Sequence, residues 1–175
     1  MRLTKITNVK QFMNKLLIEN DFDSFLVSEV VIKTFNSFVI DGHINEGFYS
    51  DEEIDSFNES ASIENRVFSD KLSRWSTLKP FALSLMKGKK TPIYFKISFY
   101  LAEENIVKLL SSADTSITLR DIDGLSLIAK YSDDELVITT SSSLNIFSLD
   151  KSLDKIWDDM VIKFLSSKGI EYEIM

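Results

Sequence analysis

The sequence has no cysteine, two prolines and five glycines among its 175 residues. A chain without thiols forms neither disulfides nor thiolate metal sites. Long disordered linkers are unexpected where proline and glycine are so scarce. No stretch approaches the roughly 20 apolar residues that span a bilayer, and residues 1–8 lack the apolar run of a secretory signal. We therefore expect a cytoplasmic protein of a bacterium, with no membrane partner.

What the sequence does contain is typical of a folded domain. Hydrophobic residues make up 44% of the chain and charged residues 27%, and there are 13 phenylalanines. Each buried aromatic ring removes a large apolar area from water. These figures predict one well-packed domain over residues 1–175.

Charge is segregated along the chain, whose net charge is −7. Residues 41–65 hold eight acids and no lysine or arginine, whereas residues 66–96 hold eight bases and one acid. The overall negative charge disfavours indiscriminate nucleic-acid binding. Two readings of the basic segment stay open. Either it is paired with the acidic segment or simply solvated, or it forms a surface for an anionic partner.

Hydrophobic patterning predicts the following elements in the first part of the chain. A strand at 3–6 precedes a helix at 9–19, for which Asn8 is the predicted N-cap. Strand-forming residues at 25–40 predict one strand, or two strands with a bend near Asn36-Ser37. Asp41-Gly42 is typical of a hairpin turn leading into a return strand at 43–48. Residues 51–65 are polar and fit a loop or a loosely held helix.

The second part is predicted in the same way. Strands are predicted at 93–101, 117–119, 125–131 and 135–140, helices at 78–86, 102–110 and 150–167, and a closing strand at 170–174. Asp133-Asp134 is the predicted turn between the last two of those four strands. The last helix is amphipathic.

This order predicts an α+β fold with a largely antiparallel sheet and about four helices. A strand, a helix and three strands occur once before residue 50 and again from 93 to 140. Residues 51–91 would then be a charged insertion between two similar halves.

No catalytic constellation, metal-ligand set or cofactor motif is visible. His43 is the only histidine, and the acidic runs at 51–55 and 133–135 have no partner motif. The residues Lys87-Gly88-Lys89-Lys90-Thr91 lack the first glycine of a phosphate-binding loop, so a nucleotide triphosphatase is rejected. They form a compact basic turn that fits contacts with phosphates.

We accordingly favour a non-enzymatic binding module that contacts nucleic acid or another polyanion. The candidate residues are Arg74, Lys79, Lys87, Lys89 and Lys90, with Trp75 for stacking. The alternatives are a small enzyme or ligand-binding protein, with a pocket near His43, Asp41 and Trp75, and a subunit that associates with a protein partner or with itself.

Three stretches resemble an uncharacterised family of small proteins from Gram-positive anaerobic bacteria: 9–17, 87–99 (KGKKTPIYFKISF) and 147–161 (FSLDKSLDKIWDDMV). That family has no assigned activity, so the resemblance implies a cytoplasmic bacterial protein and no functional residue. The element order is also similar to one domain of the sliding DNA clamps, in which helices present lysines to DNA. This second likeness would assign that role to Lys10, Lys15 and Lys108, although the last helix and residues 51–91 have no counterpart in it.

Overall fold

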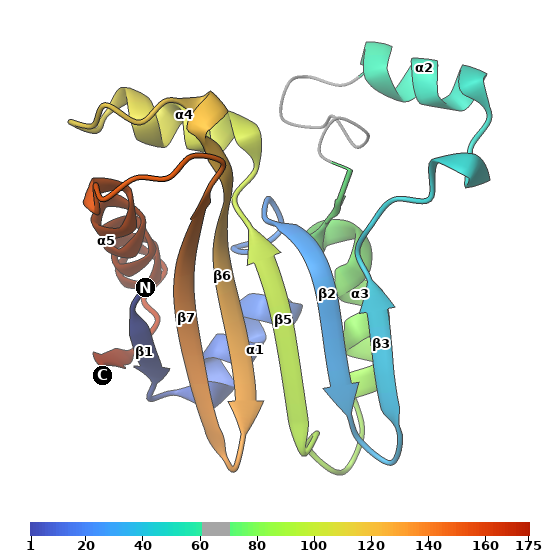
Figure 1. Ribbon diagram of the computed structural model, residues 1–175. Helices are drawn as coiled ribbons and strands as arrows, with labels where there is room; N and C mark the ends of the chain where they lie inside the picture. Colours follow the sequence, from blue (N-terminus) through green and yellow to red (C-terminus); the bar gives the residue numbers. More distant parts are fainter. Residues whose placement is uncertain (61–70) are drawn as a thin grey trace.

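The strands form one antiparallel sheet in this computed structural model, which describes residues 1–60 and 71–175 (Figure 1). Every pairing between neighbouring strands is antiparallel. Across the sheet the strands follow the order β3 (Ser37–Asp41), β2 (Leu26–Lys33), β5 (Tyr94–Tyr100), β6 (Ile122–Ser132), β7 (Glu135–Leu144), β1 (Leu3–Ile6) and β8 (Tyr172–Ile174), and the short β4 (Ser73–Arg74) pairs with β2. The predicted α+β class with a largely antiparallel sheet is confirmed.

In the described part of the chain, the α-helices are α1 (Val9–Leu17), α2 (Asp51–Ser60), α3 (Trp75–Met86), α4 (Glu103–Ser111) and α5 (Ser152–Ser167). Short 3-10 helices lie at Glu46–Phe48 and Leu119–Asp121. Helices α1, α3 and α5 pack on one face of the sheet, which we call the covered face. Helix α4 crosses one end of the sheet, and α2 stands beyond that same end (Figure 1). The other face, the open face, carries no helix among the described residues.

Local sequence explains the best-predicted elements. Helix α1 begins after Asn8, whose side-chain oxygen accepts a hydrogen bond from the backbone N–H of Gln11 at 3.1 Å. Strand β5 alternates between buried and half-buried side chains, as a sheet with one covered face requires. Helix α5 ends before Gly169, whose φ of +66° is one that glycine adopts without strain.

The core lies between the covered face and the three helices. Its largest fully buried side chains include Trp75, Trp157, Phe12, Phe22 and Phe99. Phe22 contacts Phe12 edge-on with ring centroids 5.4 Å apart, and it lies 5.8 Å from Phe99 of β5. Burial of such side chains stabilises the fold by about 1.5–3 kcal/mol each. These rings therefore join α1 to the middle of the sheet.

The predicted turn at Asp41-Gly42 is wrong. The β2–β3 hairpin closes over Thr34, Phe35 and Asn36, with Thr34 N–H donating to the Asn36 carbonyl at 2.9 Å. Gly42 instead continues the extended chain, and a Cβ there would lie 1.7 Å from the Val27 carbonyl oxygen. The glycine is thus needed for close approach to β2. The predicted return strand at 43–48 is only a bridge from His43 to Leu72, followed by a 3-10 helix.

The two halves also differ in detail from the prediction. Each has a strand, a helix and two strands, because neither the predicted strand at 43–48 nor that at 117–119 forms. Within the predicted insertion, α2 stands apart, whereas α3 contributes Trp75, Ala82 and Met86 to the core. Helix α3 begins at Trp75 and not at the predicted Leu78, so Pro80 lies inside it.

Candidate anion-binding site

The basic segment predicted at 66–96 separates into paired and unpaired side chains. Arg66 lies outside the described residues. Nη2 of Arg74 is 2.9 Å from Oε1 of Glu104, and these side chains are only 10% and 13% exposed. Nζ of Lys79 is 2.6 Å from Oδ1 of Asp23 and also donates to the carbonyl of Glu19. Arg74 and Lys79, both predicted to bind anions, therefore already contact protein carboxylates.

Lys96 is paired as well, although it lies on the open face. Its Nζ is 2.7 Å from Oε2 of Glu29 on the neighbouring strand β2, and this hydrogen bond raises the pKa of Lys96. The carboxylates that pair Arg74, Lys79 and Lys96 thus come from residues 23, 29 and 104. In the described part of the chain they do not come from the acidic segment at 41–65.

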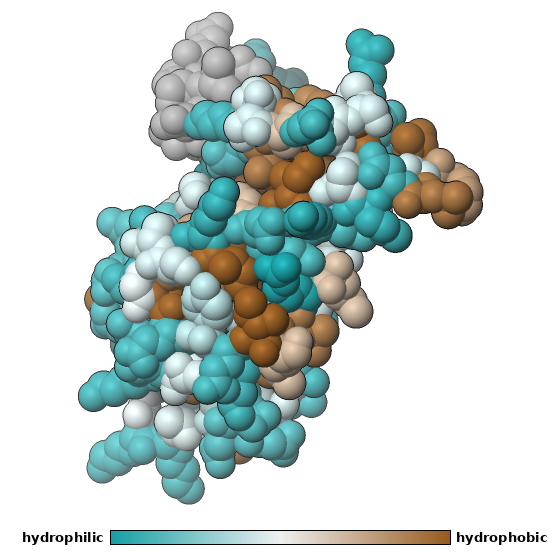
Figure 2. Space-filling model, turned by 90° about the vertical axis from the view of Figure 1, so that its left-hand side faces the viewer, coloured by the Kyte–Doolittle hydropathy of each residue, from teal (hydrophilic) through white to brown (hydrophobic). Residues whose placement is uncertain are grey.

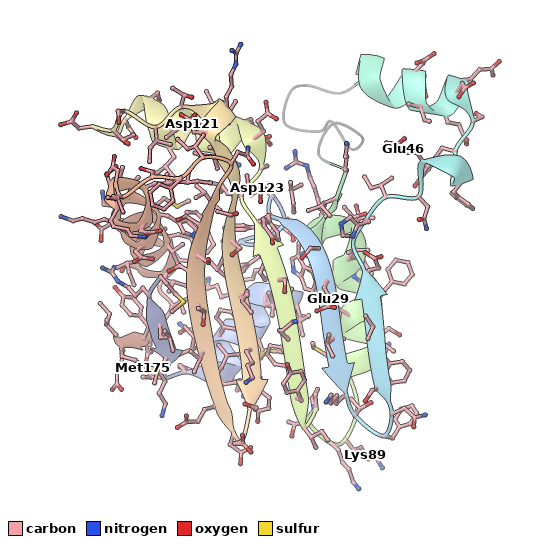
Figure 3. The ribbon with its side chains drawn as sticks, viewed as in Figure 1. Glu29, Glu46, Lys89, Asp121, Asp123 and Met175 are labelled. Carbon is pink, nitrogen blue, oxygen red and sulfur yellow. The ribbon has the colours of Figure 1, made fainter. Side chains whose placement is uncertain are left out.

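Lys87, Lys89 and Lys90 differ from these three. They lie in the loop from α3 to β5, and all are exposed. None of them forms an ion pair with a carboxylate whose side chain the structure describes, in residues 1–56 and 71–175. Lys89 projects from the end of the sheet opposite α2 (Figure 3). We call this end, where the β2–β3 and α3–β5 connections lie, the basic end.

A hollow of about 650 Å³ opens at the basic end, and we call it the basic hollow. Its lining is Thr34, Phe35, Leu85, Met86, Lys87, Gly88, Lys89, Lys90, Thr91 and Ile93. The lining is therefore largely apolar, and the three unpaired lysines belong to it. Phe35 is 85% exposed and Ile93 is 70% exposed. The backbone joins the two sides of the hollow, because Ile93 N–H donates to the Lys33 carbonyl at 2.9 Å.

No carboxylate lines the basic hollow. The acidic turn Asp133-Asp134 lies at this same end of the sheet, because Ser132 pairs with Tyr94, and both of its residues have the positive φ of a tight hairpin (Figure 1). It lies between β6 and β7, on the other side of β5 from β2. A further lysine, Lys33, lies at the end of β2 with its Nζ 5.0 Å from the ring centroid of Tyr94. Positive charge thus extends from the hollow to the open face.

Two other hollows are less distinctive. One of about 360 Å³ is lined by Asp23, Ser24, Arg74, Ser76, Glu104, Asn105 and Lys108, a mixture of charges in which Arg74 is paired with Glu104. Another, of about 290 Å³, is lined by residues of both charge signs with Tyr100 and Gly124. Neither concentrates charge of one sign as the basic hollow does.

The remaining predicted site residues lie elsewhere. Nδ1 of His43 is 2.6 Å from Oδ1 of Asp41, and both side chains are exposed. Hydrogen bonds from the backbone and ring of His43 lower the pKa of Asp41. His43 lines none of the three hollows described above. Trp75 is fully buried, with Nε1 donating to the Leu16 carbonyl at 2.7 Å, so its indole is out of reach of a stacking ligand.

The acidic runs have structural positions. Asp51, Glu52 and Glu53 form the first turn of α2, where negative charge is favourable to the helix dipole. Ser50 and Glu53 form reciprocal side-chain to backbone hydrogen bonds of 2.8 and 3.2 Å. No group of three or more metal-ligating side chains exists among the described residues.

The side of the molecule that carries α5 is mostly hydrophilic, with hydrophobic surface in its middle and toward the top (Figure 2). The loop from β7 to α5 exposes Ile146, Phe147 and Leu149. These three residues line none of the described hollows. They are separate from the candidate site.

Sequence reasoning missed Phe35 and Lys33 as site residues. The charge run identified the three lysines, because they are consecutive in sequence apart from Gly88. Phe35 joins them only through the pairing of β2 with β5, which brings residues 33 and 94 together. The available signal was a phenylalanine at the centre of a hairpin connection.

Comparisons with known proteins identify a family and no activity. No curated protein and no solved structure matches the chain significantly. The lysines assigned by the clamp likeness are dispersed, with Lys10 and Lys15 on α1 and Lys108 on α4 across the far end. Among the residues described, no helix combines the length and hydrophobicity that a membrane span needs. A family model described as "Family of unknown function (DUF5721)" matches residues 15–173. The chain therefore belongs to this family of unknown function.

Proposed function

We propose that this protein is a non-enzymatic binding module whose basic end binds an anionic polymer, with nucleic acid the preferred partner. The observation that carries the proposal is the set of three exposed lysines, Lys87, Lys89 and Lys90, around a hollow without carboxylates. A bacterial, cytoplasmic setting, which we continue to expect from the sequence, would supply such polymers.

The pairing pattern supports this choice. A lysine that already holds a carboxylate must lose that contact before it binds phosphate, as Lys79 and Lys96 would. The three loop lysines have no such contact to lose among the described residues. Their short spacing along one loop also matches a string of phosphates, since each lysine can neutralise a separate phosphate and release its counterions.

The net charge of −7 sets the expected character of binding. Attraction must come from the local field of the basic end, because the chain as a whole repels a polyanion. Contacts of three lysines with a single strand predict a slope of about −2 in log K against log salt, or roughly 15-fold weaker binding between 50 and 200 mM salt.

Fluorescence anisotropy with a labelled single-stranded 20-mer tests the proposal. We expect the triple variant K87E/K89E/K90E to lose most of the binding and most of the salt dependence. The matched control is K151E/K155E/K163E, which changes the net charge equally on α5 and its N-cap, where Lys151, Lys155 and Lys163 are exposed. Equal losses in both variants, or no binding by the wild-type protein, would contradict the proposal.

A further inference from the structure

We infer that the basic hollow takes unpaired bases, so that this module prefers single-stranded to duplex nucleic acid. This inference rests on the proposed function. It adds that the polymer is single-stranded and that Phe35 contacts its bases. The site is Phe35 together with the apolar residues of the hollow, and the ligand is a short run of unpaired nucleotides.

Phe35 has the properties of a stacking platform. Its ring is 85% exposed, although a phenylalanine in a protein of this size is ordinarily placed in the core. The hairpin backbone that carries it is closed by the hydrogen bond of 2.9 Å from Thr34 N–H to the Asn36 carbonyl. The ring also contacts Phe38 edge-on, with ring centroids 5.6 Å apart and planes at 75°. The contact with Phe38 supports one edge of the ring, and the rest of the exposed ring is open to a stacking base.

The hollow has two chemical zones that match the two zones of a single strand. Leu85, Met86 and Ile93 give its lining an apolar part, and Lys87, Lys89 and Lys90 give it positive charge. In an unpaired strand the bases offer π faces and the backbone offers phosphates, so aromatic side chains and a basic groove act together. The volume of about 650 Å³ lies within the range of roughly 300–1,000 Å³ for ligand pockets, which is ample for an unpaired base.

A duplex fits only half of this arrangement. Its phosphates can reach the lysines, but its bases are stacked and paired inside the helix. Phe35 and the apolar residues of the hollow would then give up their contact with water without gaining a contact with a base. The preference for a single strand therefore depends on Phe35, whereas the lysines contribute to both forms.

An anionic membrane is the competing occupant, since exposed apolar side chains flanked by lysines also suit a lipid surface. The shape favours the strand. Phe35 and Ile93 line a concavity, and a bilayer surface has no projecting group to fill it, whereas a base does.

The test uses the full chain, its variants Phe35→Ala and Phe35→Tyr, and three labelled 20-mers measured by anisotropy at one salt concentration. The oligomers are oligo-dT, an abasic strand with the same number of phosphates, and a duplex. We expect the wild type to bind oligo-dT more tightly than the other two. Phe35→Ala should weaken oligo-dT binding roughly 5- to 150-fold, as loss of one stacked base does. Its affinity for the abasic strand should not change, and Phe35→Tyr should keep the preference.

Equal affinity for oligo-dT and the abasic strand, or no effect of Phe35→Ala, would overturn the inference while leaving the polyanion proposal intact. Failure of the wild type to bind any of the three polymers would instead refute the proposed function. Cosedimentation with vesicles of phosphatidylcholine and phosphatidylglycerol completes the test. Phe35-dependent binding to these vesicles, without discrimination between oligo-dT and the abasic strand, would assign the hollow to a membrane.

Discussion

The indole of Trp75 donates a hydrogen bond from Nε1 to the backbone carbonyl of Leu16 at 2.7 Å, which ties the first residue of α3 to the end of α1. Trp75 also contacts Phe99 of β5 edge-on, with ring centroids 5.4 Å apart. Trp75, which the sequence suggested for ligand stacking, thus connects α1 and α3 with the sheet.

Replacement of Trp75 is expected to affect stability and not binding. Trp75→Phe should lower the free energy of unfolding by about 1–3 kcal/mol, because the Leu16 carbonyl loses its donor in a buried place. Trp75→Ala should lower it by about 3–5 kcal/mol. Urea denaturation followed by circular dichroism measures both, with Phe81→Ala as the control, because Phe81 is 62% exposed. A stable Trp75→Phe variant that has lost oligonucleotide binding would contradict this account.

Gly42 should tolerate no side chain. An added Cβ would lie 1.7 Å from the carbonyl oxygen of Val27, so Gly42→Ala must displace β2 or the chain beside it. We expect a loss of at least 1–3 kcal/mol in unfolding free energy, the usual cost of overpacking. Gly47→Ala is the matched control, since its Cβ would have no neighbour within 4 Å. Equal stability of the two variants in urea would show that Gly42 is not confined as described.

Asp154 should make the fold sensitive to acid. A hydrogen bond from the Ser142 hydroxyl, aided by the positive charges of the N-terminus and of Lys151, lowers the pKa of Asp154 below its ordinary value of 3.8. Because the folded pKa is lower than the unfolded pKa, this stabilisation is fully present above about pH 4–5 and is lost as the pH falls through the folded pKa. The stability difference between wild type and Asp154→Asn should therefore be constant from pH 7 to 5 and shrink below pH 4. Urea titrations across this range, with Asp159→Asn as the control, measure it, and a pH-independent difference would contradict the assignment.

Paired and unpaired lysines should differ in their contribution to polyanion binding. Lys89→Gln should reduce the salt slope by about 0.7, the effect of one lost phosphate contact with a single strand. Lys96→Gln removes the same charge, but Nζ of Lys96 already lies 2.7 Å from Oε2 of Glu29. The salt slope of this variant should therefore stay close to that of the wild type. Anisotropy at four or more salt concentrations distinguishes the two. A larger change for Lys96→Gln would place the binding surface on the open face of the sheet.

Elements with strong local patterns were predicted well. Asn8 identified the start of α1, alternation identified β5, and apolar spacing identified α5, because each signal lies within a few residues. The turn predicted at Asp41-Gly42 was wrong because the signal there is not local. Its glycine is required by the approach of a strand that is distant in sequence, and the local pattern of a turn contains no information about that neighbour.

The candidate site was predictable in part for the same physical reason. The charge run revealed the loop lysines, which lie together along the chain. It could not separate them from Arg74, Lys79 and Lys96, because the paired carboxylates at positions 104, 23 and 29 are brought near only by folding. The place of Phe35 beside the loop likewise depends on strand pairing across the sheet.

The position of α2 has an electrical consequence. Its exposed acids Asp51, Glu52, Glu53 and Asp55 stand at one end of the molecule, and Lys89 of the basic loop projects from the other (Figure 3). The length of the sheet thus separates the loop lysines from these acids of α2. A polyanion that approaches the loop lysines would avoid the repulsion of the α2 acids, whereas one that approaches α2 would meet it. If the proposed binding holds, repulsion by α2 would thus help to select the lysine end as the point of contact on a protein that is negative overall.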